Sequence, residues 1–155
     1  MHETVSADPM KGVYCLVLNL PRRARMRVGS LGQCDFPPGM YAYVGSALGG
    51  IEQRVRRHKS TSKRRRWHID YLLEKASVTG TVAIPGDRKS IECGVAQALL
   101  RGDSAAVVAE GFGSSDCGCR SHLIYFGDLD PECVAETISM ALAMLQCVYP
   151  KDVSR

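Results

Sequence analysis

The residues best suited to chemistry lie between Tyr43 and His58, where a strand-like segment, a glycine turn and a helix-like segment follow one another. Arg54 precedes Arg57 and His58 by three and four residues, which places the three side chains on one face of a helix. Arginine is always charged and offers paired hydrogen bonds that match a phosphate. Two guanidiniums, an imidazole and a tyrosine at one corner therefore predict a phosphodiester site. The alternative is an exposed basic helix after an ordinary turn.

Two short motifs belong to this pattern: residues 12–14 read Gly-Val-Tyr, and residues 43–45 read Tyr-Val-Gly. Together with Arg54 and His58 on the following helix, this ordered set resembles the GIY-YIG nuclease superfamily. The chain is similar in particular to a small branch of that superfamily, found mainly in archaea and some bacteria. That branch carries segments like those at residues 67–71, 92–93 and 111–117.

The resemblance implies a mixed α/β fold of the α+β kind, with a small, largely antiparallel sheet flanked by helices. It also implies a metal-dependent DNA endonuclease, with DNA repair as a setting. Tyr14 and Tyr43 match the tyrosines near the attacking water, and Arg54 matches the arginine on the phosphate. His58 matches an accessory position. Glu92 matches the glutamate that holds one magnesium or manganese ion, both of which are hard ions that keep much of their hydration.

Each of these residues also has a plainer interpretation. Tyr14 and Tyr43 could pack on a sheet face, where tyrosine is common. His58 could end a helix, and Glu92 could interact only with its own helix start, since each charge would suit the dipole there. Their order along the chain favours the catalytic interpretation over four separate structural ones.

Positive charge is concentrated in one stretch, because residues 51–66 hold eight Lys or Arg and a single acid, Glu52. The net charge of the whole chain is only +4, so the rest is nearly balanced. A local basic patch favours an anionic polymer as partner, here DNA, with RNA as an alternative. Trp67 could stack on a base or pack in the core. The residues predicted to bind nucleic acid are Arg57, Lys63, Arg64, Arg65 and Arg66.

A second constellation combines Cys117, Cys119 and His122, with Cys93 as a further candidate. Thiolate and imidazole are the ligands that zinc prefers. The spacing differs from that of common zinc ribbons and fingers, so we expect no stoichiometric zinc. Two rivals to the nuclease thus remain open: a nucleic-acid-binding module that has lost catalysis, and a zinc-stabilised interaction domain.

The expected elements form one domain over residues 11–150, preceded by a flexible tail of residues 1–10. The long separation of the two tyrosine motifs is assigned to an extra hairpin, in which a strand at residues 25–29 pairs back on the strand at residues 12–20 after a turn at residues 21–24. Residues 31–39 contain a further turn signal, Pro37-Pro38-Gly39. Further strands are expected at residues 12–20, 40–45, 78–84 and 123–126. Four helices are expected: the first begins at residue 51, the second spans residues 64–75, the third ends at about residue 100, and the fourth begins at residue 131.

Composition narrows the setting of this domain. The chain has 155 residues, of which 45% are hydrophobic and 23% charged, as is ordinary for a globular protein. Seven cysteines, an odd number scattered through expected strands and helices, argue against a disulfide scaffold. No leader segment and no apolar run of membrane-spanning length is evident, so we expect a cytoplasmic protein without a membrane partner. The sequence does not predict an oligomeric state.

Overall fold

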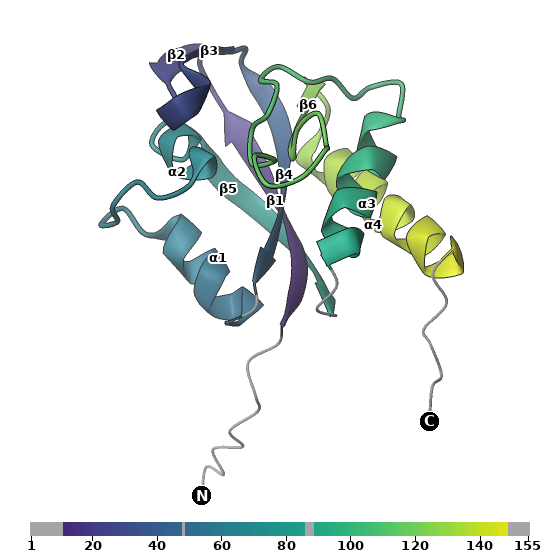
Figure 1. Cartoon of the computed structure of the whole chain (residues 1–155). Coiled ribbons are helices and arrows are strands. Elements are labelled where there is room, and N and C mark those ends of the chain that lie inside the picture. Colours follow the sequence, from purple (N-terminus) through teal and green to yellow (C-terminus); the bar gives the residue numbers. More distant parts are fainter. Residues whose placement is uncertain (1–10, 48, 86–88, 149–155) are drawn as a thin grey trace, which may run out of the picture.

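A four-stranded antiparallel sheet forms the centre of the computed structural model, which describes residues 11–47, 49–85 and 89–148 (Figure 1). Its strands are β1 (Gly12–Leu20), β4 (Gly39–Ala47), β5 (Ser77–Pro85) and β6 (Leu123–Gly127). The strand order is β5-β1-β4-β6. The prediction of a mixed fold with a largely antiparallel sheet is therefore confirmed. The predicted tail, residues 1–10, lies outside the described residues, as do residues 149 and 150 of the predicted domain.

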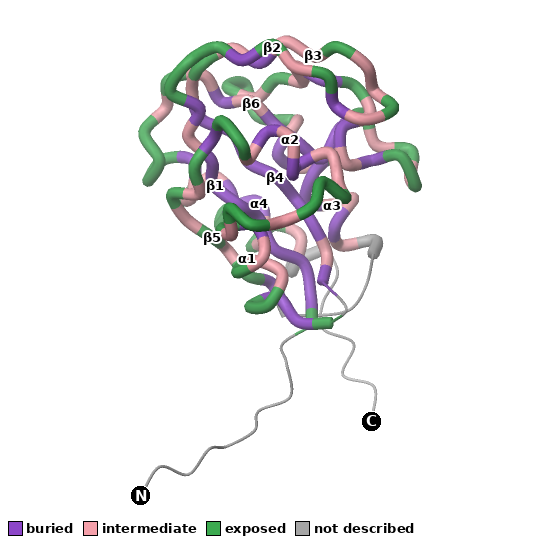
Figure 2. Tube along the Cα trace, turned by 90° about the vertical axis from the view of Figure 1, so that its left-hand side faces the viewer, coloured by how far each residue is buried: buried purple, intermediate pink, exposed green. Residues whose placement is uncertain are grey.

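Helices cover both faces of this sheet (Figure 1). They are α1 (Ile51–Lys59), α2 (His68–Leu72), α3 (Lys89–Leu100) and α4 (Pro131–Val148). Helices α1 and α2 lie on one face, and α3 and α4 lie on the other. Because both faces are covered, β1 is an almost unbroken apolar run, in which Asn19 alone among its nine residues is not fully buried. Figure 2 shows that buried positions follow the strands.

Alternation along β1 decides which side chains meet which helices. Tyr14 and Leu16 point to the core formed with α1 and α2, whereas Val13 and Cys15 point to the core formed with α3 and α4. The same alternation runs through β4, where Tyr43 shares the face of Tyr14. The sheet thus separates the side chains of Tyr14 and Tyr43 from the apolar core formed with α3 and α4.

The extra hairpin does lie between the two tyrosine motifs, but its strands differ from the prediction. Strand β2 (Ala24–Arg27) pairs with β3 (Gln33–Phe36) as a separate two-stranded sheet, and the short 3-10 helix η1 (Gly29–Leu31) joins them. We expected residues 25–29 to pair back on β1, and this was wrong, because β2 pairs with β3 inside the segment 31–39, where we had expected only a turn signal. The turn signal of Pro37 and Pro38 marks only the end of that strand, because the preceding Phe36 is fully buried in the core.

The second helix is shorter than predicted. We expected residues 64–75, whereas α2 spans only His68–Leu72 and residues 64–66 have no regular structure. The reason is Asp70, whose Oδ2 accepts hydrogen bonds from the backbone nitrogens of Arg66 and Trp67 at 2.7 and 2.9 Å. These bonds cap the helix start and leave the preceding arginines outside the helix.

The other predicted elements are confirmed within a few residues. Helix α4 begins as expected, with Asp130 before Pro131, and Asp130 Oδ1 accepts from the backbone nitrogen of Glu132 at 3.0 Å. Between α3 and β6, the residues from 101 to 122 form a long loop whose one strand-like contact is the bridge from Ala106 to Tyr125. In the described part of the chain, no helix is both long and apolar enough to cross a bilayer.

Candidate functional site

The two motif tyrosines converge on the face of the sheet that α1 covers. Strand pairing sets Tyr14 opposite Gly45 and Tyr43 opposite Leu16, so both tyrosines lie on the same side. A Cβ atom at Gly45 would stand 2.6 Å from the Tyr14 hydroxyl, which means that only glycine leaves room for this ring. Tyr14 Oη then forms a 2.6 Å hydrogen bond with His58 Nε2 of α1. Tyr14, Tyr43, Arg54 and His58 together are called the tyrosine corner below.

Burial dominates the protonation behaviour of this corner. Tyr14 and His58 are only 1% and 2% exposed. Burial lowers the pKa of His58 to about 4, so its imidazole is neutral at pH 7. Burial also raises the pKa of Tyr14 well above its usual range, which the Arg54 guanidinium opposes, and it likewise raises the pKa of Tyr43. His58 Nδ1 is buried without a hydrogen-bond partner among the described residues.

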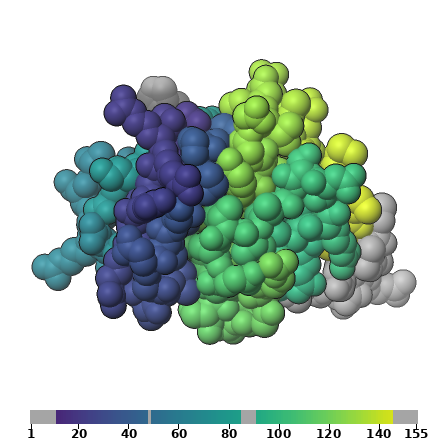
Figure 3. All heavy atoms as spheres, turned by 90° about the horizontal axis from the view of Figure 1, so that it is seen from above, coloured from purple at the N-terminus to yellow at the C-terminus, as the bar shows by residue number. Residues whose placement is uncertain are grey.

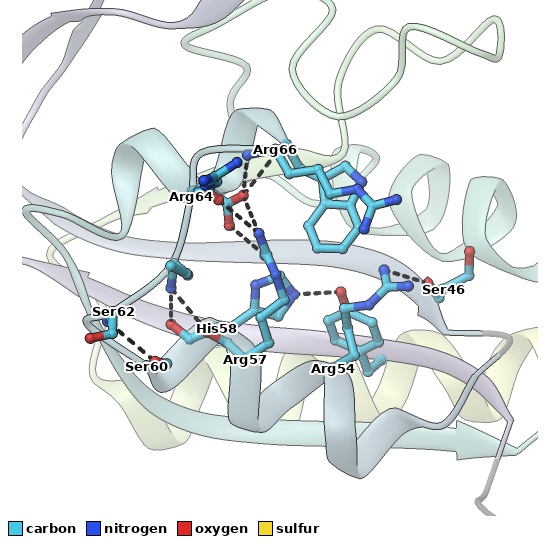
Figure 4. Close-up of polar contacts among 12 residues, drawn as sticks. Ser46, Arg54, Arg57, His58, Ser60, Ser62, Arg64 and Arg66 are labelled. Atoms are coloured by element: carbon cyan, nitrogen blue, oxygen red, sulfur yellow. Dashed lines mark hydrogen bonds and ion pairs between the residues drawn. The ribbon is translucent and has the colours of Figure 1, made fainter.

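Arg54 closes the corner on its outer side (Figure 4). Its Nη1 donates to the backbone oxygen of Ser46 at 3.2 Å, and its guanidinium lies 4.3 Å from the centre of the Trp67 ring. Trp67 in turn lies 6.1 Å from the His58 ring and is half-buried. The corner is therefore packed beneath one arginine and one indole. Stacking of Trp67 on a base stays a prediction.

Arg57 has a structural partner that the sequence interpretation did not name. Its two terminal nitrogens donate to both oxygens of Asp70, at 2.9 and 3.0 Å, and Asp70 is 1% exposed. Burial raises the pKa of Asp70, but the hydrogen bonds from Arg57, Trp67 and Arg66 outweigh it and lower that pKa. An acidic residue three positions after a helix start is a known capping signal, and it could have identified Asp70.

A basic hollow opens beside the tyrosine corner, with a volume of about 790 Å³. Six of its nine lining residues are cationic, and none is acidic. The cationic residues are Arg56, Arg57, Lys63, Arg64, Arg65 and Arg66, and the neutral ones are Gln53, Ser60 and Ser62. All five residues predicted to bind nucleic acid thus line one surface. Besides Arg57, two of these five residues already have partners within the protein. Lys63 Nζ donates to the backbone oxygens of Arg57 and His58, and Arg65 pairs with Glu74 at 2.8 Å.

Arg64 and Arg66 are the cations of this hollow best placed to meet an anion. Among the described residues, neither guanidinium has a carboxylate partner, and the Arg66 guanidinium lies 5.2 Å from the centre of the Trp67 ring. A phosphate entering the hollow would therefore not have to displace an acidic side chain from either of them.

A second polar group lies on the far side of β4, where α3 meets the 101–122 loop. The ligand atoms of Cys93, Cys117, Cys119 and His122 all lie within 4.8 Å of one another, and these four residues are called the Cys3His cluster below. His122 Nε2 lies 3.5 Å from the sulfur of Cys117 and 4.0 Å from that of Cys93. Cys93 therefore completes the set. From the sequence spacing alone we expected a poor tetrahedral arrangement. Because the packing of α3 brings Cys93 to the other three residues, the spacing no longer argues against a metal site.

The pKa values of two cluster thiols, those of Cys93 and Cys119, shift in opposite directions. Burial first, and then contacts with Cys119 and Cys117, raise the pKa of Cys93 to about 12. Burial also acts to raise the pKa of Cys119, but hydrogen bonds from His122, Cys93 and Gln97 outweigh it and lower that pKa. A thiolate on Cys119 is thus stabilised by its neighbours, which is the protonation state that binds a metal.

Glu92 lies on the first turn of α3, as predicted, but its nearest partner belongs to the Cys3His cluster. It is 8% exposed, and its Oε1 lies 3.1 Å from His122 Nδ1, an ion-pair distance at an angle outside that of a hydrogen bond. Its negative charge also contributes to the raised pKa values of Tyr14 and Tyr43. Glu92 therefore stands between the tyrosine corner and the cluster.

The two kinds of metal site make different demands on these residues. Magnesium and manganese prefer several oxygen ligands and water, whereas three thiols and an imidazole suit zinc. A metal ion could be held by the Cys3His cluster, whose donors are of the zinc type. Glu92 alone, with one oxygen against His122, fits a hard ion poorly.

Comparison with known proteins gives one result. No curated protein and no solved structure matches the chain. The model of a protein family matches residues 13–145, a range that includes the tyrosine corner, the basic hollow and the Cys3His cluster. The chain therefore belongs to the family described as the domain of unknown function DUF123.

Proposed function

We propose that this protein is an endonuclease that hydrolyses phosphodiester bonds in DNA at the tyrosine corner. The observation that carries this proposal is the 2.6 Å hydrogen bond between Tyr14 Oη and His58 Nε2. It joins the first tyrosine motif to the helix that follows the second motif, with Arg54 beside it. Strand and helix packing alone does not require a buried phenol to meet a neutral imidazole.

The corner offers a path for the proton of an attacking water. Tyr14 Oη accepts that proton while its own proton passes to His58 Nε2, and the imidazole becomes an imidazolium. The resulting hydroxide attacks phosphorus, the bond to the leaving oxygen breaks, and that oxygen takes a proton from solvent. Burial lowers the pKa of His58 to about 4, so the ring is neutral at pH 7 and holds the proton only transiently. Arg54 opposes the rise in the pKa of Tyr14, which eases transfer of the phenolic proton.

Substrate binding must open the corner, since Tyr14 and His58 are almost fully buried. Arg54 is the residue best placed to do so. It would exchange its bond to the Ser46 carbonyl for the phosphate, a stronger, charge-assisted partner. DNA lying in the basic hollow would place one of its phosphates beside this guanidinium, because α1 carries both Arg54 and part of the hollow lining.

The divalent ion implied by the resemblance, magnesium or manganese, fits this corner incompletely. It would neutralise charge on the leaving oxygen, and Glu92 is the carboxylate expected to hold it. One Glu92 oxygen already lies against His122, and Asp70 is occupied by Arg57. We therefore assign neutralisation of the phosphate to Arg54. The cleavage assay below is run with magnesium, manganese or chelator to measure the dependence.

Tyr14→Phe tests this function, with Tyr125→Phe as the matched control. Each change removes one hydroxyl, but that of Tyr125 donates to the backbone oxygen of Pro38, away from the corner. Single-turnover cleavage of nicked, branched and linear DNA should fall by about 100-fold or more for Tyr14→Phe and stay unchanged for the control. Absence of cleavage by the unmodified protein on every substrate and with every ion would refute the nuclease assignment.

Binding without cleavage is the second candidate, and the basic hollow favours it. Its lining holds six cations and no acidic residue, and Arg64 and Arg66 have no carboxylate partner among the described residues, so a nucleic-acid backbone, DNA or RNA, could bind there. In that case Arg64→Ala should weaken binding and reduce its salt dependence by about one unit of slope, while no substrate is cut. The free cysteines among the described residues suit the reducing cytoplasm in which we place either activity.

A further inference from the structure

We propose that Cys93, Cys117, Cys119 and His122 bind one structural zinc ion, and that Glu92 positions His122 for it. The four donors come from two parts of the chain, one from α3 and three from the end of the 101–122 loop. They nevertheless lie within 4.8 Å of one another. This site is separate from the proposed cleavage site and does not depend on it.

The distances agree with a tetrahedral zinc site. Bonds of about 2.3 Å to sulfur and about 2.05 Å to nitrogen place a sulfur and a nitrogen about 3.6 Å apart. His122 Nε2 lies 3.5 Å from Cys117 Sγ and 4.0 Å from Cys93 Sγ, so small movements would complete the geometry. Four protein ligands leave no open position, which is the pattern of a structural rather than a catalytic zinc site.

Glu92 supplies the support that a zinc-binding histidine usually has. The nitrogen of His122 that faces the thiols is Nε2, and its other nitrogen, Nδ1, faces Glu92 Oε1 at 3.1 Å. A carboxylate at this position fixes the ring and the tautomer, and it raises the basicity of the ligating nitrogen. Glu92 is thus a positioning residue, and its place beside Cys93 on α3 explains its burial better than a water-rich magnesium site does.

The ion would tie the end of the long 101–122 loop to α3. The 101–122 loop packs beside the β2–β3 hairpin (Figure 3), and Phe112 meets the rings of Phe36 and Tyr43 at 5.9 and 6.3 Å. Its backbone bonds include Gly113 to His68 Nδ1 and His122 to Phe112. Long loops without regular structure are costly to order, and a metal clip to α3 reduces that cost.

Elemental analysis of the purified full chain tests the ion itself. We expect one zinc per chain, lost in Cys93→Ser and in Cys117→Ser. The matched controls are Cys34→Ser and Cys133→Ser, whose thiols are free and lie outside the cluster, and these should keep the zinc. Zinc retained after Cys117→Ser, or a protein without zinc whose cluster cysteines form disulfides by mass spectrometry, would overturn the proposal.

Cobalt substitution and chelator competition test the geometry and the role of Glu92, even if the cysteine variants fold poorly. Cobalt in the unmodified protein should give the absorption of a tetrahedral site with three sulfur ligands. Glu92→Ala should weaken zinc binding about 10- to 100-fold, and Glu92→Gln should restore most of it, because an amide oxygen can still accept from Nδ1. An octahedral cobalt spectrum or an unchanged affinity in Glu92→Ala would contradict these assignments. Since DNA cleavage is not the readout, failure here leaves the proposed nuclease untouched.

Discussion

Two buried histidines show how differently the two polar regions of this protein are built. His58 in the tyrosine corner and His122 in the Cys3His cluster are 2% and 0% exposed. Burial acts to lower the pKa of both rings. It prevails at His58, whereas at His122 the Glu92 carboxylate and Cys119 outweigh it and raise the pKa. The pKa of a buried histidine therefore depends on the chemistry of its nearest partners as well as on burial.

The difference between the partners matches different tasks. His58 Nε2 meets the phenol of Tyr14, the group from which it would take a proton. His122 has thiols beside Nε2 and a carboxylate oxygen at an ion-pair distance from Nδ1, so its neighbours include potential negative charges. The first arrangement suits proton transfer, and the second suits a fixed ligand. Perturbing each region separately should therefore change different observables.

Zinc removal should give the largest change in stability and should affect the cluster alone. Zinc at a thousand times its dissociation constant stabilises the folded state by about 4 kcal/mol. Chelation should then lower Tm by roughly 10 °C for a chain of this size. Calorimetry with and without chelator measures this, and the Cys117→Ser variant, which lacks a ligand, should not respond. An equal response in that variant would show that the chelator acts elsewhere.

Arg54→Ala should give the largest change in catalysis and leave the zinc content unchanged. Arg54 and Arg65 belong to the same basic stretch of the sequence. Arg54 is part of the tyrosine corner, whereas Arg65 lines the hollow and pairs with Glu74. We expect Arg54→Ala to slow the chemical step by about 100-fold with little loss of binding, and Arg65→Ala to reduce affinity only. Single-turnover cleavage beside a salt titration of binding separates the two effects. Equal rate losses that affinity explains would place Arg54 outside the active site.

Acid should destabilise the protein through His58. The unfolded state binds a proton at a pKa near 6.5, and the folded state binds it only at about 4. Stability is therefore complete above pH 6.5 and is lost as the pH falls towards 4. Between pH 7 and pH 5 the loss should be about 2 kcal/mol. Denaturant titrations at both pH values measure it, and the pH dependence should be smaller in His58→Gln. An unchanged pH dependence in that variant would assign the loss to other groups.

A comparison of two glycines gives the smallest expected effect. A methyl group at Gly45 would lie 2.6 Å from the Tyr14 hydroxyl, whereas one at Gly118, in the cluster loop, would meet nothing within 4 Å. Gly45→Ala should cost about 1–2 kcal/mol and shift the Tyr14 ring away from His58. Gly118→Ala should be nearly neutral. Urea denaturation of the two variants measures this difference, and equal stabilities would show that the corner adapts to the added atom.

The sequence was most informative where a side chain's position depends on local pattern. Tyr43, Arg54 and His58 follow one another through a strand, a turn and a helix, so their common corner was predictable. That Tyr14 joins them depends on the pairing of β1 with β4 across the intervening hairpin, which local pattern does not show. The cluster depended on tertiary packing. Cys93 is separated from Cys117 by a helix end and a long loop, and spacing alone could not show that they meet.

Individual hydrogen bonds account for other differences from the prediction. The aromatic and basic spacing of residues 64–75 suggested a long helix, but the Asp70 carboxylate binds two backbone nitrogens ahead of it and fixes the helix start at His68. A buried acid with several donors has more effect on the helix boundary than the propensities of the arginines before it. Arg57 likewise binds Asp70, although its charge alone suggested a phosphate.

Trp67 gives this protein an optical probe of its own. It is the single tryptophan of the chain, and the guanidiniums of Arg54, Arg57 and Arg66 lie 4.3, 4.2 and 5.2 Å from its ring centre. Indole emission responds to nearby charge and to water. Movement of Arg54 towards a phosphate would take one cation from the ring and admit solvent, so the emission wavelength and intensity should change with it. Stopped-flow fluorescence of the unlabelled protein can therefore time the opening of the tyrosine corner.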